Sequence, residues 1–379
     1  MQVYLDNSST TKTLPKVIES MVKTMEENFG NPSSMHRLGF ESEKLLKNSR
    51  RTLLEALEVE ETHNLVFTSG GTEADNLAIM GTALRNSRRG KKIITSSIEH
   101  PAVLESMKHL EKLGFEIVYL PVDSEGIVDF DDLEKSLTKD VILVSIMRAN
   151  NETGSMEPID RIRAFANEIG AFFHTDAVQS FGKTVDNLGD LISISGHKIG
   201  GPKGIGALLY RRDIKLEPVI YGGGQEFALR SGTENLPAVV GFKKAVENID
   251  VRHFQSKVGT LKKKLLKEIK RNIKDIKVNS PEGHNCLSNI LNISFLNTRS
   301  EVILHSLEQR GVYVSSGSAC SSKNTKGSHV LKAMGRNNRE IESAIRFSLS
   351  EFTKEDEIDY AIKAVIDSVN AFRKLGGMR

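Results

Sequence analysis

Short apolar runs alternate with amphipathic stretches through the first two thirds of the chain. The runs are rich in branched residues, as in buried β-strands, and the stretches between them repeat apolar residues every three or four positions, as in helices. Strands that alternate with helices over short links predict a mostly parallel sheet covered on both faces, that is, an α/β fold. The predicted strands lie at residues 65–68, 92–96, 116–120, 141–147, 171–175, 191–194 and 205–210.

The pattern changes after Pro237, where a long helical stretch begins. Its apolar residues from Phe254 to Ile273 form one stripe, and residues 257–277 carry nine Lys or Arg against two acidic residues. This basic face indicates a solvated helix surface, with contact to an acidic partner or RNA as the alternative. Mixed strands and helices follow, among them a strand predicted at residues 312–315, which indicates a second, smaller α+β domain. We expect a large domain at residues 15–252 and a small domain made of residues 1–14 and 253–379.

The composition argues against several classes of protein for this chain. Of 379 residues, 39% are hydrophobic and 27% are charged, as in ordinary globular proteins. The net charge of +3 predicts neither nucleic-acid nor membrane binding, and no apolar run approaches a membrane span. The first residues show no secretory signal. Cys286 and Cys320 form no disulfide framework and lack metal-ligand spacing, so we expect a cytoplasmic protein without a metal site.

A lysine stands in a turn rich in Gly and Pro between the last two predicted strands of the sheet. The glycines allow close backbone approach to a ligand, and Ser195, His197 and free N–H groups could hold an anion beside Lys198. An amine next to an anion site suits a Schiff base with a phosphorylated aldehyde cofactor. The alternative is a β-hairpin that happens to carry Lys198.

Further polar residues fall at the carboxyl ends of the predicted strands, where α/β sheets bind ligands. Gly71 and Thr72 open a helix whose free N–H groups favour a phosphate, although an ordinary turn explains them as well. Asp176 could pair with a protonated pyridine nitrogen, with Gln179 one turn later, or could simply cap a helix. His100 and Asn151 have equally good explanations as turn residues.

Cys320 lies in a segment of small and polar residues with almost nothing to pack into a core. We therefore expect an accessible thiol on a mobile loop, acting as a nucleophile or sulfur carrier, with an incidental exposed thiol as the alternative. Cys286 precedes a predicted strand and suggests inert packing. Arg346, inside an apolar strand, needs a partner such as a carboxylate, and the turn at Thr233 could hold an anion or be routine.

Six ordered motifs over essentially the whole chain resemble the NifS/IscS-type cysteine desulfurases of the class V aminotransferase family. The resemblance implies the aspartate aminotransferase-like fold (fold type I) of enzymes that depend on pyridoxal 5'-phosphate. Family members are homodimers with the site at the subunit interface. The motifs are YLDN at residues 4–7, GNPSS at 30–34, TSGGTE at 68–73, SGHK at 195–198, RSGT at 230–233 and SGSAC at 316–320.

The resemblance also implies a role for each candidate residue. Lys198 would carry the cofactor, Asp176 would pair with its ring nitrogen, Gln179 would bond its ring hydroxyl, and His100 would stack on the ring and move protons. The phosphate would be held by Gly71, Thr72, Ser195 and His197, and by Thr233 of the neighbouring subunit. Asn151 and Arg346 would bind the substrate carboxylate.

The implied reaction converts L-cysteine to L-alanine and leaves the sulfur on Cys320 as a persulfide. An iron–sulfur scaffold or a tRNA-thiolating enzyme would accept the sulfur, and no direct contact with nucleic acid is expected.

An aminotransferase or a selenocysteine lyase of the same fold is the first alternative function, and transamination has no use for a thiol at Cys320. A non-catalytic partner protein that binds the cofactor is the second. A nucleotide-binding α/β domain is the third, although no G-x-G-x-x-G follows the first strands.

Overall fold

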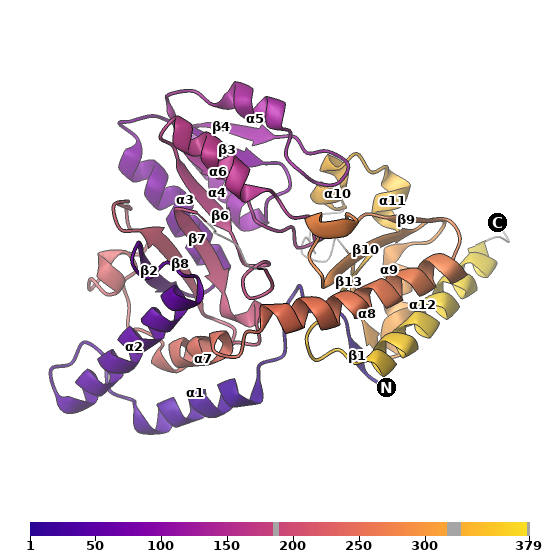
Figure 1. The fold of residues 1–379 in the computed structure, drawn as a ribbon, viewed down its shortest axis with the longest axis horizontal. Helices are drawn as coiled ribbons and strands as arrows, with labels where there is room; N and C mark the ends of the chain where they lie inside the picture. Colours follow the sequence, from indigo (N-terminus) through magenta and orange to yellow (C-terminus); the bar gives the residue numbers. More distant parts are fainter. Residues whose placement is uncertain (185–188, 317–326, 377–379) are drawn as a thin grey trace.

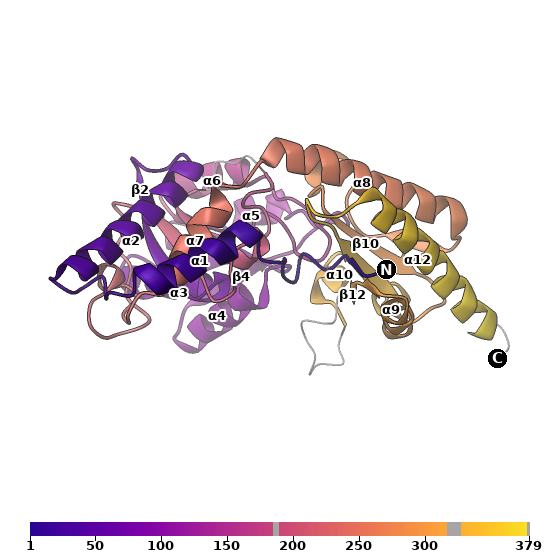
Figure 2. The ribbon, with the colours of Figure 1, turned by 90° about the horizontal axis from the view of Figure 1, so that it is seen from below.

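The computed structural model describes residues 1–184, 189–316 and 327–376. Two lobes lie side by side, each with its own β-sheet and apolar core (Figure 1). Figure 2 shows the first residues against the smaller lobe, before the chain crosses to helix α1 (Pro15–Glu27) of the larger lobe. The chain therefore joins the lobes at its beginning as well as near residue 250.

The larger lobe is built on a seven-stranded sheet in which one strand runs against the others. β8 pairs antiparallel with β2 and β7, whereas all other neighbours pair parallel. The mostly parallel α/β sheet predicted from the sequence is confirmed. In spatial order the strands are β2 (His63–Thr68), β8 (Gly206–Arg211), β7 (Leu191–Ser195), β6 (Phe172–Asp176), β5 (Val141–Ser145), β3 (Lys92–Ser96) and β4 (Glu116–Leu120).

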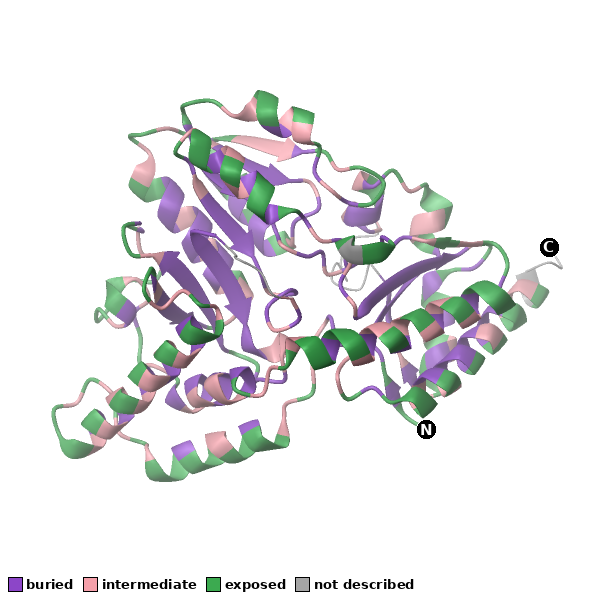
Figure 3. Cartoon of the chain, viewed as in Figure 1, coloured by how far each residue is buried: buried purple, intermediate pink, exposed green. Residues whose placement is uncertain are grey.

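Helices cover both faces of this sheet because successive side chains of a strand point to opposite sides. On β2, Leu65 and Phe67 join one core cluster and Val66 joins the other. Figure 3 accordingly shows the strands buried between the helices. The helices on the Val66 side are α3 (Gly71–Asn86) and α4 (Pro101–Lys112), and those on the Leu65 side are α2 (Arg37–Ala56), α5 (Phe130–Ser136), α6 (Ile159–Glu168) and α7 (Leu236–Val246).

The smaller lobe contains a four-stranded antiparallel sheet with helices packed on it. The predicted apolar stripe from Phe254 to Ile273 is buried in its core, together with Val3 and Leu5. The smaller domain is thus confirmed, while its boundaries stay a prediction. The strands are β12 (Ser315–Ser316), β13 (Ala344–Ser348), β10 (Ile290–Phe295) and β9 (Ile276–Val278); the helices are α8 (Val251–Asn272), α9 (Ser300–Gln309), α10 (His329–Ala333), α11 (Asn338–Glu342) and α12 (Glu355–Gly376).

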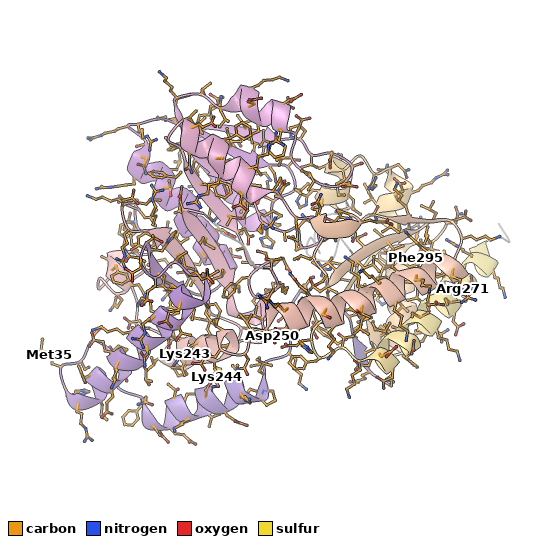
Figure 4. All side chains as sticks on the ribbon, viewed as in Figure 1. Met35, Lys243, Lys244, Asp250, Arg271 and Phe295 are labelled. Atoms are coloured by element: carbon orange, nitrogen blue, oxygen red, sulfur yellow. The ribbon has the colours of Figure 1, made fainter. Side chains whose placement is uncertain are left out.

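Two predicted elements are each divided in the structure. The helical stretch after Pro237 is two helices, α7 and α8, and the Asp250 side chain accepts a hydrogen bond from the His253 N–H at the start of α8 (Figure 4). The strand predicted at residues 312–315 is β11 (Val312–Tyr313), which pairs with β1 (Val3–Tyr4), followed by β12, which pairs with β13. Within the described ranges, no helix has the length and apolar character that crossing a membrane requires.

Candidate active site

A cavity of about 280 Å³ lies at the carboxyl ends of the parallel strands, where the two lobes meet. All the predicted site residues except Thr233 and Cys320 line it. Thr233 is exposed outside this cavity, and Cys320 lies outside the described residues. The lining residues are Ser8, Ser9, Gly71, Thr72, Asp75, His100, Met147, Ala149, Asn151, Asp176, Val178, Gln179, Ser195, His197, Lys198 and Arg346.

Lys198 reaches the cavity from the turn between β7 and β8. These strands pair antiparallel, with Ser195 opposite Gly206, so the turn closes a hairpin. The Lys198 Nζ donates hydrogen bonds to the carbonyl oxygens of Ser8 and Ser9, the latter at 2.8 Å. A β-hairpin and a cofactor-binding lysine, the two interpretations of this stretch, are therefore compatible, because the hairpin places the Lys198 amine in the cavity.

Two buried carboxyl groups and the half-buried His100 face one another in the cavity. Atoms of Asp75, His100 and Asp176 that could bind a metal lie within 4.8 Å of one another. Burial raises the pKa of Asp176, although His100 and Lys198 act in the opposite direction. Burial and the neighbouring Asp176 raise the pKa of Asp75, and burial lowers the pKa of His100. Two carboxyl groups in this setting favour a cationic ligand, such as a protonated pyridine nitrogen.

Helix α3 begins at the cavity and offers N–H groups to it. Gly70, its N-cap, has no capping side chain, so the first N–H groups of the helix are left for a ligand. A Cβ at Gly71 would lie 2.6 Å from the Val178 Cγ2, so only glycine fits without a shift of its neighbour. The Ser195 hydroxyl, nearby and buried, has no hydrogen-bond partner in the described structure. These features fit a phosphate group.

His197 adds a neutral imidazole to this part of the cavity. Its Nδ1 lies 3.1 Å from the Thr10 hydroxyl. Burial and the charges of nearby lysines, Lys198 first among them, lower the pKa of His197 to about 4. The ring therefore stays neutral at physiological pH and can hydrogen-bond a phosphate without adding charge.

Other atoms at the cavity match a larger polar ligand better than a bare metal ion. The Gln179 Nε2 donates to the Ser8 carbonyl at 3.0 Å, while its Oε1 is buried without a partner among the described residues. An ion held by Asp75, His100 and Asp176 would leave this oxygen and the Ser195 hydroxyl unsatisfied. A planar cofactor with a phosphate, a ring nitrogen and a ring hydroxyl would use all of them.

Arg346 enters the cavity from β13 of the smaller lobe and is almost fully buried. Its Nη1 donates to the Asn151 carbonyl at 2.9 Å, and its Nη2 donates to Asp6 at 2.8 Å and to the Ser9 hydroxyl at 2.7 Å. Asp6 is therefore the carboxylate partner that we expected for Arg346 from the sequence. The Arg346 Nε lacks a hydrogen-bond partner among the described residues, which leaves one donor for a ligand.

Sequence reasoning missed the part of the cavity that is made by the N-terminal segment. Ser8 and Ser9 lie in a polar loop that carries no recognisable motif and reaches the site only because β1 joins the smaller lobe. Asp75 was missed as well. An acidic residue one turn after Gly71, within a helix of small and apolar residues, was the available signal.

Comparison with known proteins gives the family of this chain. The profile described as Aminotransferase class-V matches residues 3–361. The cysteine desulfurase IscS of Dictyoglomus turgidum is 44% identical, covering 99% of this chain and 96% of that protein. The cysteine desulfurase IscS of Methanosarcina thermophila is 42% identical, covering 98% and 93%.

Solved structures agree with these sequence matches. A structure described as a NifS-like protein superposes with a TM-score of 0.91 at 36% identity, covering 98% of this chain and 100% of the other. A structure described as SspA in complex with cysteine gives a TM-score of 0.81 at 35% identity, covering 93% and 100%. The chain therefore belongs to the class V aminotransferase family of pyridoxal-phosphate enzymes and, within it, to the NifS/IscS-type cysteine desulfurases.

Proposed function

We propose that this protein is a pyridoxal-phosphate-dependent cysteine desulfurase that converts L-cysteine to L-alanine and takes the sulfur onto Cys320. The observation that carries the proposal is one cavity that joins the Lys198 amine, the buried Asp176 carboxyl and the unpaired Ser195 hydroxyl at a helix N-terminus. The relatives named cysteine desulfurase, and the structure described as SspA with cysteine, support cysteine as the substrate.

In this proposal each part of the cavity holds one part of the cofactor. Asp176 pairs with the ring nitrogen, Gln179 bonds the ring hydroxyl, and His100 covers the ring face. Residues of the α3 N-terminus and of the hairpin turn hold the phosphate, and Thr233 adds a hydroxyl from the neighbouring subunit. The phosphate-binding residues of the chain itself are Gly71, Thr72, Ser195 and His197.

When bound, pyridoxal phosphate supplies the electron sink that makes the bonds of the substrate Cα and Cβ labile. Arg346 and Asn151 bind the substrate carboxylate. Lys198, which would carry the cofactor, would also supply the amine that moves the Cα proton. The Cys320 thiolate attacks the substrate sulfur, so an S–S bond forms as the Cβ–S bond breaks. The electron pair stays with the substrate, which is then protonated and leaves as alanine.

The reaction is tested by incubating the purified protein with L-cysteine and a reductant and measuring alanine and sulfide. Equal amounts of both support the proposal, whereas a keto acid without sulfide would show an aminotransferase. A strong preference for selenocysteine would show a selenocysteine lyase. A cofactor spectrum without any product would show a non-catalytic partner protein.

Two variants separate the roles of the lysine and the cysteine. We expect Lys198→Ala to lose the Schiff-base absorbance, because the amine that carries the cofactor is gone. We expect Cys320→Ala to keep this absorbance but to release at least 100-fold less sulfide. Full sulfide production by Cys320→Ala would sink the assignment of the nucleophile.

We further propose that the protein is a cytoplasmic homodimer. Ile18, Val22 and Met25 form an exposed apolar stripe on α1, continued by Phe29 and Met35. Such a contiguous apolar surface marks an interaction site. In such a homodimer, as the family resemblance implies, Thr233 of the neighbouring subunit would add its hydroxyl to the phosphate site. A reducing cytoplasm keeps the Cys320 thiol free for an acceptor, either an iron–sulfur scaffold or a tRNA-thiolating enzyme.

A further inference from the structure

A second and larger cavity lies between α8 and residues 278–291, on the smaller lobe and its border with the larger one. Its volume is about 680 Å³. Among the residues that the structure describes, it shares none with the lining of the Lys198 cavity, so the reaction described above makes no use of it. It is lined by Met156, Lys183, Thr184, Gln255, Gly259, Lys262, Lys263, Leu266, Lys267, Lys270, Val278, Ser280, Pro281, Glu282, Gly283, Cys286, Leu287, Ser288 and Leu291, and we call it the α8 groove.

The α8 groove is strongly basic although the protein as a whole is nearly neutral. Among the described residues, five lysines and one acidic residue line it, and that residue, Glu282, is already paired with Lys270 at 2.7 Å. One of the five, Lys183, is buried, and burial lowers its pKa to about 7. Lys263 and Lys267 are exposed and make no hydrogen bond or ion pair with any described residue. Lys263 and Lys267 therefore bring positive charge to the groove that no described acidic residue neutralises, and this charge attracts anionic ligands.

One further lysine is held in place at the wall of the groove. The Lys262 Nζ donates to the Leu287 carbonyl at 2.8 Å and lies 3.0 Å from the Cys286 sulfur. This sulfur is half-buried at the groove wall and does not belong to the apolar clusters of the core. Its contact with Lys262 keeps a positive charge in the groove at a fixed position.

The floor of the groove is apolar. Leu287 and Leu291 are buried below it, and half-buried Leu266 lies beside them. The cationic rim and the apolar floor together fit a ligand that has both carboxylates and aliphatic groups. No aromatic residue is among the described residues that line the groove, so it offers no stacking platform for the bases of RNA.

The length of the groove fits an extended peptide. A rise of ~1.5 Å per residue separates Gln255 and Lys270 by about 22 Å along α8, which is the length of about seven extended residues. Lys263 and Lys267 are one helical turn apart, about 6 Å, which is close to the roughly 6.6 Å between alternate side chains of a strand. Alternating acidic residues would therefore meet successive lysines.

We propose that the α8 groove binds an acidic peptide segment of a partner protein in extended conformation. Carboxylates on one side of the segment pair with Lys263 and Lys267, while aliphatic side chains on the other side rest on the half-buried Leu266 and Val278. The segment is recognised by its charge and its alternating pattern. This site is independent of the proposed reaction, so either one stands if the other fails.

The probe is a fluorescein-labelled seven-residue peptide of alternating Glu and Leu, with Gln in place of Glu as the matched control. Its binding to the full-length protein with cofactor is followed by fluorescence anisotropy. We expect saturable binding of the Glu peptide, weakened at high salt, and at least tenfold weaker binding of the Gln peptide. Absence of saturable binding of the Glu peptide to the wild-type protein would overturn the proposal.

Three variants locate the site. The double substitution Lys263→Ala with Lys267→Ala removes two groove charges, and Arg271→Ala with Lys274→Ala removes two exposed charges outside the groove, near the end of α8 (Figure 4). Gly259→Phe keeps every charge but fills the groove, since the nearest heavy atom to a Cβ at Gly259 is the Ser288 Cβ at 3.7 Å.

We expect the first double variant and Gly259→Phe each to weaken peptide binding at least tenfold, and the second double variant less than threefold. All three lie outside the Lys198 cavity, so an unchanged cofactor absorbance shows that they fold. Equal losses in both double variants, or undiminished binding by Gly259→Phe, would show a general charge effect and refute the groove. The proposal would also be refuted if oligouridine or inorganic phosphate displaced the labelled peptide at lower concentrations than the unlabelled Glu peptide does. The ligand of the groove would then be RNA or a small anion.

Discussion

At the scale of single residues, the cofactor cavity is marked by polar atoms that have no partner in the described part of the protein. The Ser195 hydroxyl and the Gln179 Oε1 are buried, and the Arg346 Nε lacks an acceptor. Leaving a buried polar group unpaired costs about 1–3 kcal/mol. Several such groups around one cavity are best explained by a ligand that satisfies them all.

Ser195→Ala tests this explanation. We expect the unfolding free energy of the cofactor-free protein to stay the same or rise slightly, because the removed hydroxyl has no partner there. Pyridoxal-phosphate affinity should fall about tenfold or more, since a hydrogen bond to a charged group contributes about 1.5–3 kcal/mol. Denaturant unfolding and a cofactor titration measure the two quantities.

Ser145→Ala is the matched control for this change. Its hydroxyl is equally buried on β5, two strands from β7 in the same sheet, but bonds the His174 Nδ1 at 2.8 Å. We expect this variant to lose about 1 kcal/mol of stability and to keep its cofactor affinity. If Ser145→Ala lowered cofactor affinity and Ser195→Ala did not, Ser195 would not bind the phosphate.

Glu99 carries the clearest pH dependence of the fold. It is fully buried, accepts hydrogen bonds from the Ser96 hydroxyl at 2.6 Å and from the Met147 N–H at 3.0 Å, and has its pKa raised by burial to about 8. Below pH 4.5 both the folded and the unfolded protein hold this proton. Between pH 4.5 and about 8 only the folded protein holds it, so stability falls as the pH rises through this window.

Glu99→Gln keeps the acceptor for Met147 and removes the titration. We expect the variant to gain stability relative to the wild type between pH 5 and pH 8, by up to roughly 1.4 kcal/mol per pH unit. Urea unfolding of the cofactor-free proteins at both pH values measures the difference. A constant difference between the two proteins would show that Glu99 does not hold a proton in the folded state.

At the scale of elements, the loop that carries Thr233 is held in an unusual conformation. Three successive residues without glycine, Glu226, Phe227 and Ala228, have φ angles of 46°, 60° and 59°. Each costs roughly 1–2 kcal/mol in this left-handed region. The Glu226 carboxylate stabilises the turn by accepting two hydrogen bonds from Arg50, at 2.8 and 2.9 Å, and one from the Phe67 N–H at 2.8 Å.

Glu226→Ala should therefore loosen this loop and leave the largely buried Arg50 charge without its carboxylate partner. Breaking such a pair costs about 3–5 kcal/mol. We expect faster hydrogen exchange at residues 220–233, measured by mass spectrometry, and weaker cofactor binding if Thr233 completes the phosphate site. Glu105→Ala breaks an exposed pair with Lys108 and should change neither quantity. Unchanged exchange in Glu226→Ala would mean that other contacts hold the loop.

At the scale of the whole molecule, the catalytic cavity needs both lobes. Its walls come from strand ends of the larger lobe, from Arg346 of the smaller lobe and from the N-terminal segment. Ser8 lies against Gln179 and the Lys198 amine, about 170 and 190 residues away along the chain. The cavity is therefore assembled only when the first residues have paired with β11.

The apolar stripe on α1 gives the prediction for the whole molecule. We expect Val22→Asp with Met25→Asp to convert a dimer into a monomer in light scattering, because two charges would be buried in the interface. Cofactor affinity should fall with it if Thr233 acts across the interface. Val302→Asp, at a similarly exposed position on α9, should leave the dimer intact. A dimer that survives the double substitution places the interface elsewhere.

Local sequence patterns were enough to predict the α/β class, the strands of the parallel sheet and the candidate residues at the ends of those strands. These follow from local rules, since side-chain periodicity reports which face of an element is buried, and parallel strands end at one edge of the sheet. Lys198, Asp176 and Gly71 were found in this way. The short helix α5 was not, because seven residues are too few to show a helical period.

Which residues lie in contact depends on how the elements pack in three dimensions. Ser8, Ser9 and Asp75 gave no usable motif, and the partner of Arg346 proved to be Asp6, 340 residues away. Likewise, the sequence showed a basic helix face on α8, but packing decided which of its lysines border a groove and which are paired. Such contacts, and the burial that raises the pKa of Asp176, depend on distances that the chain acquires only when both lobes have packed.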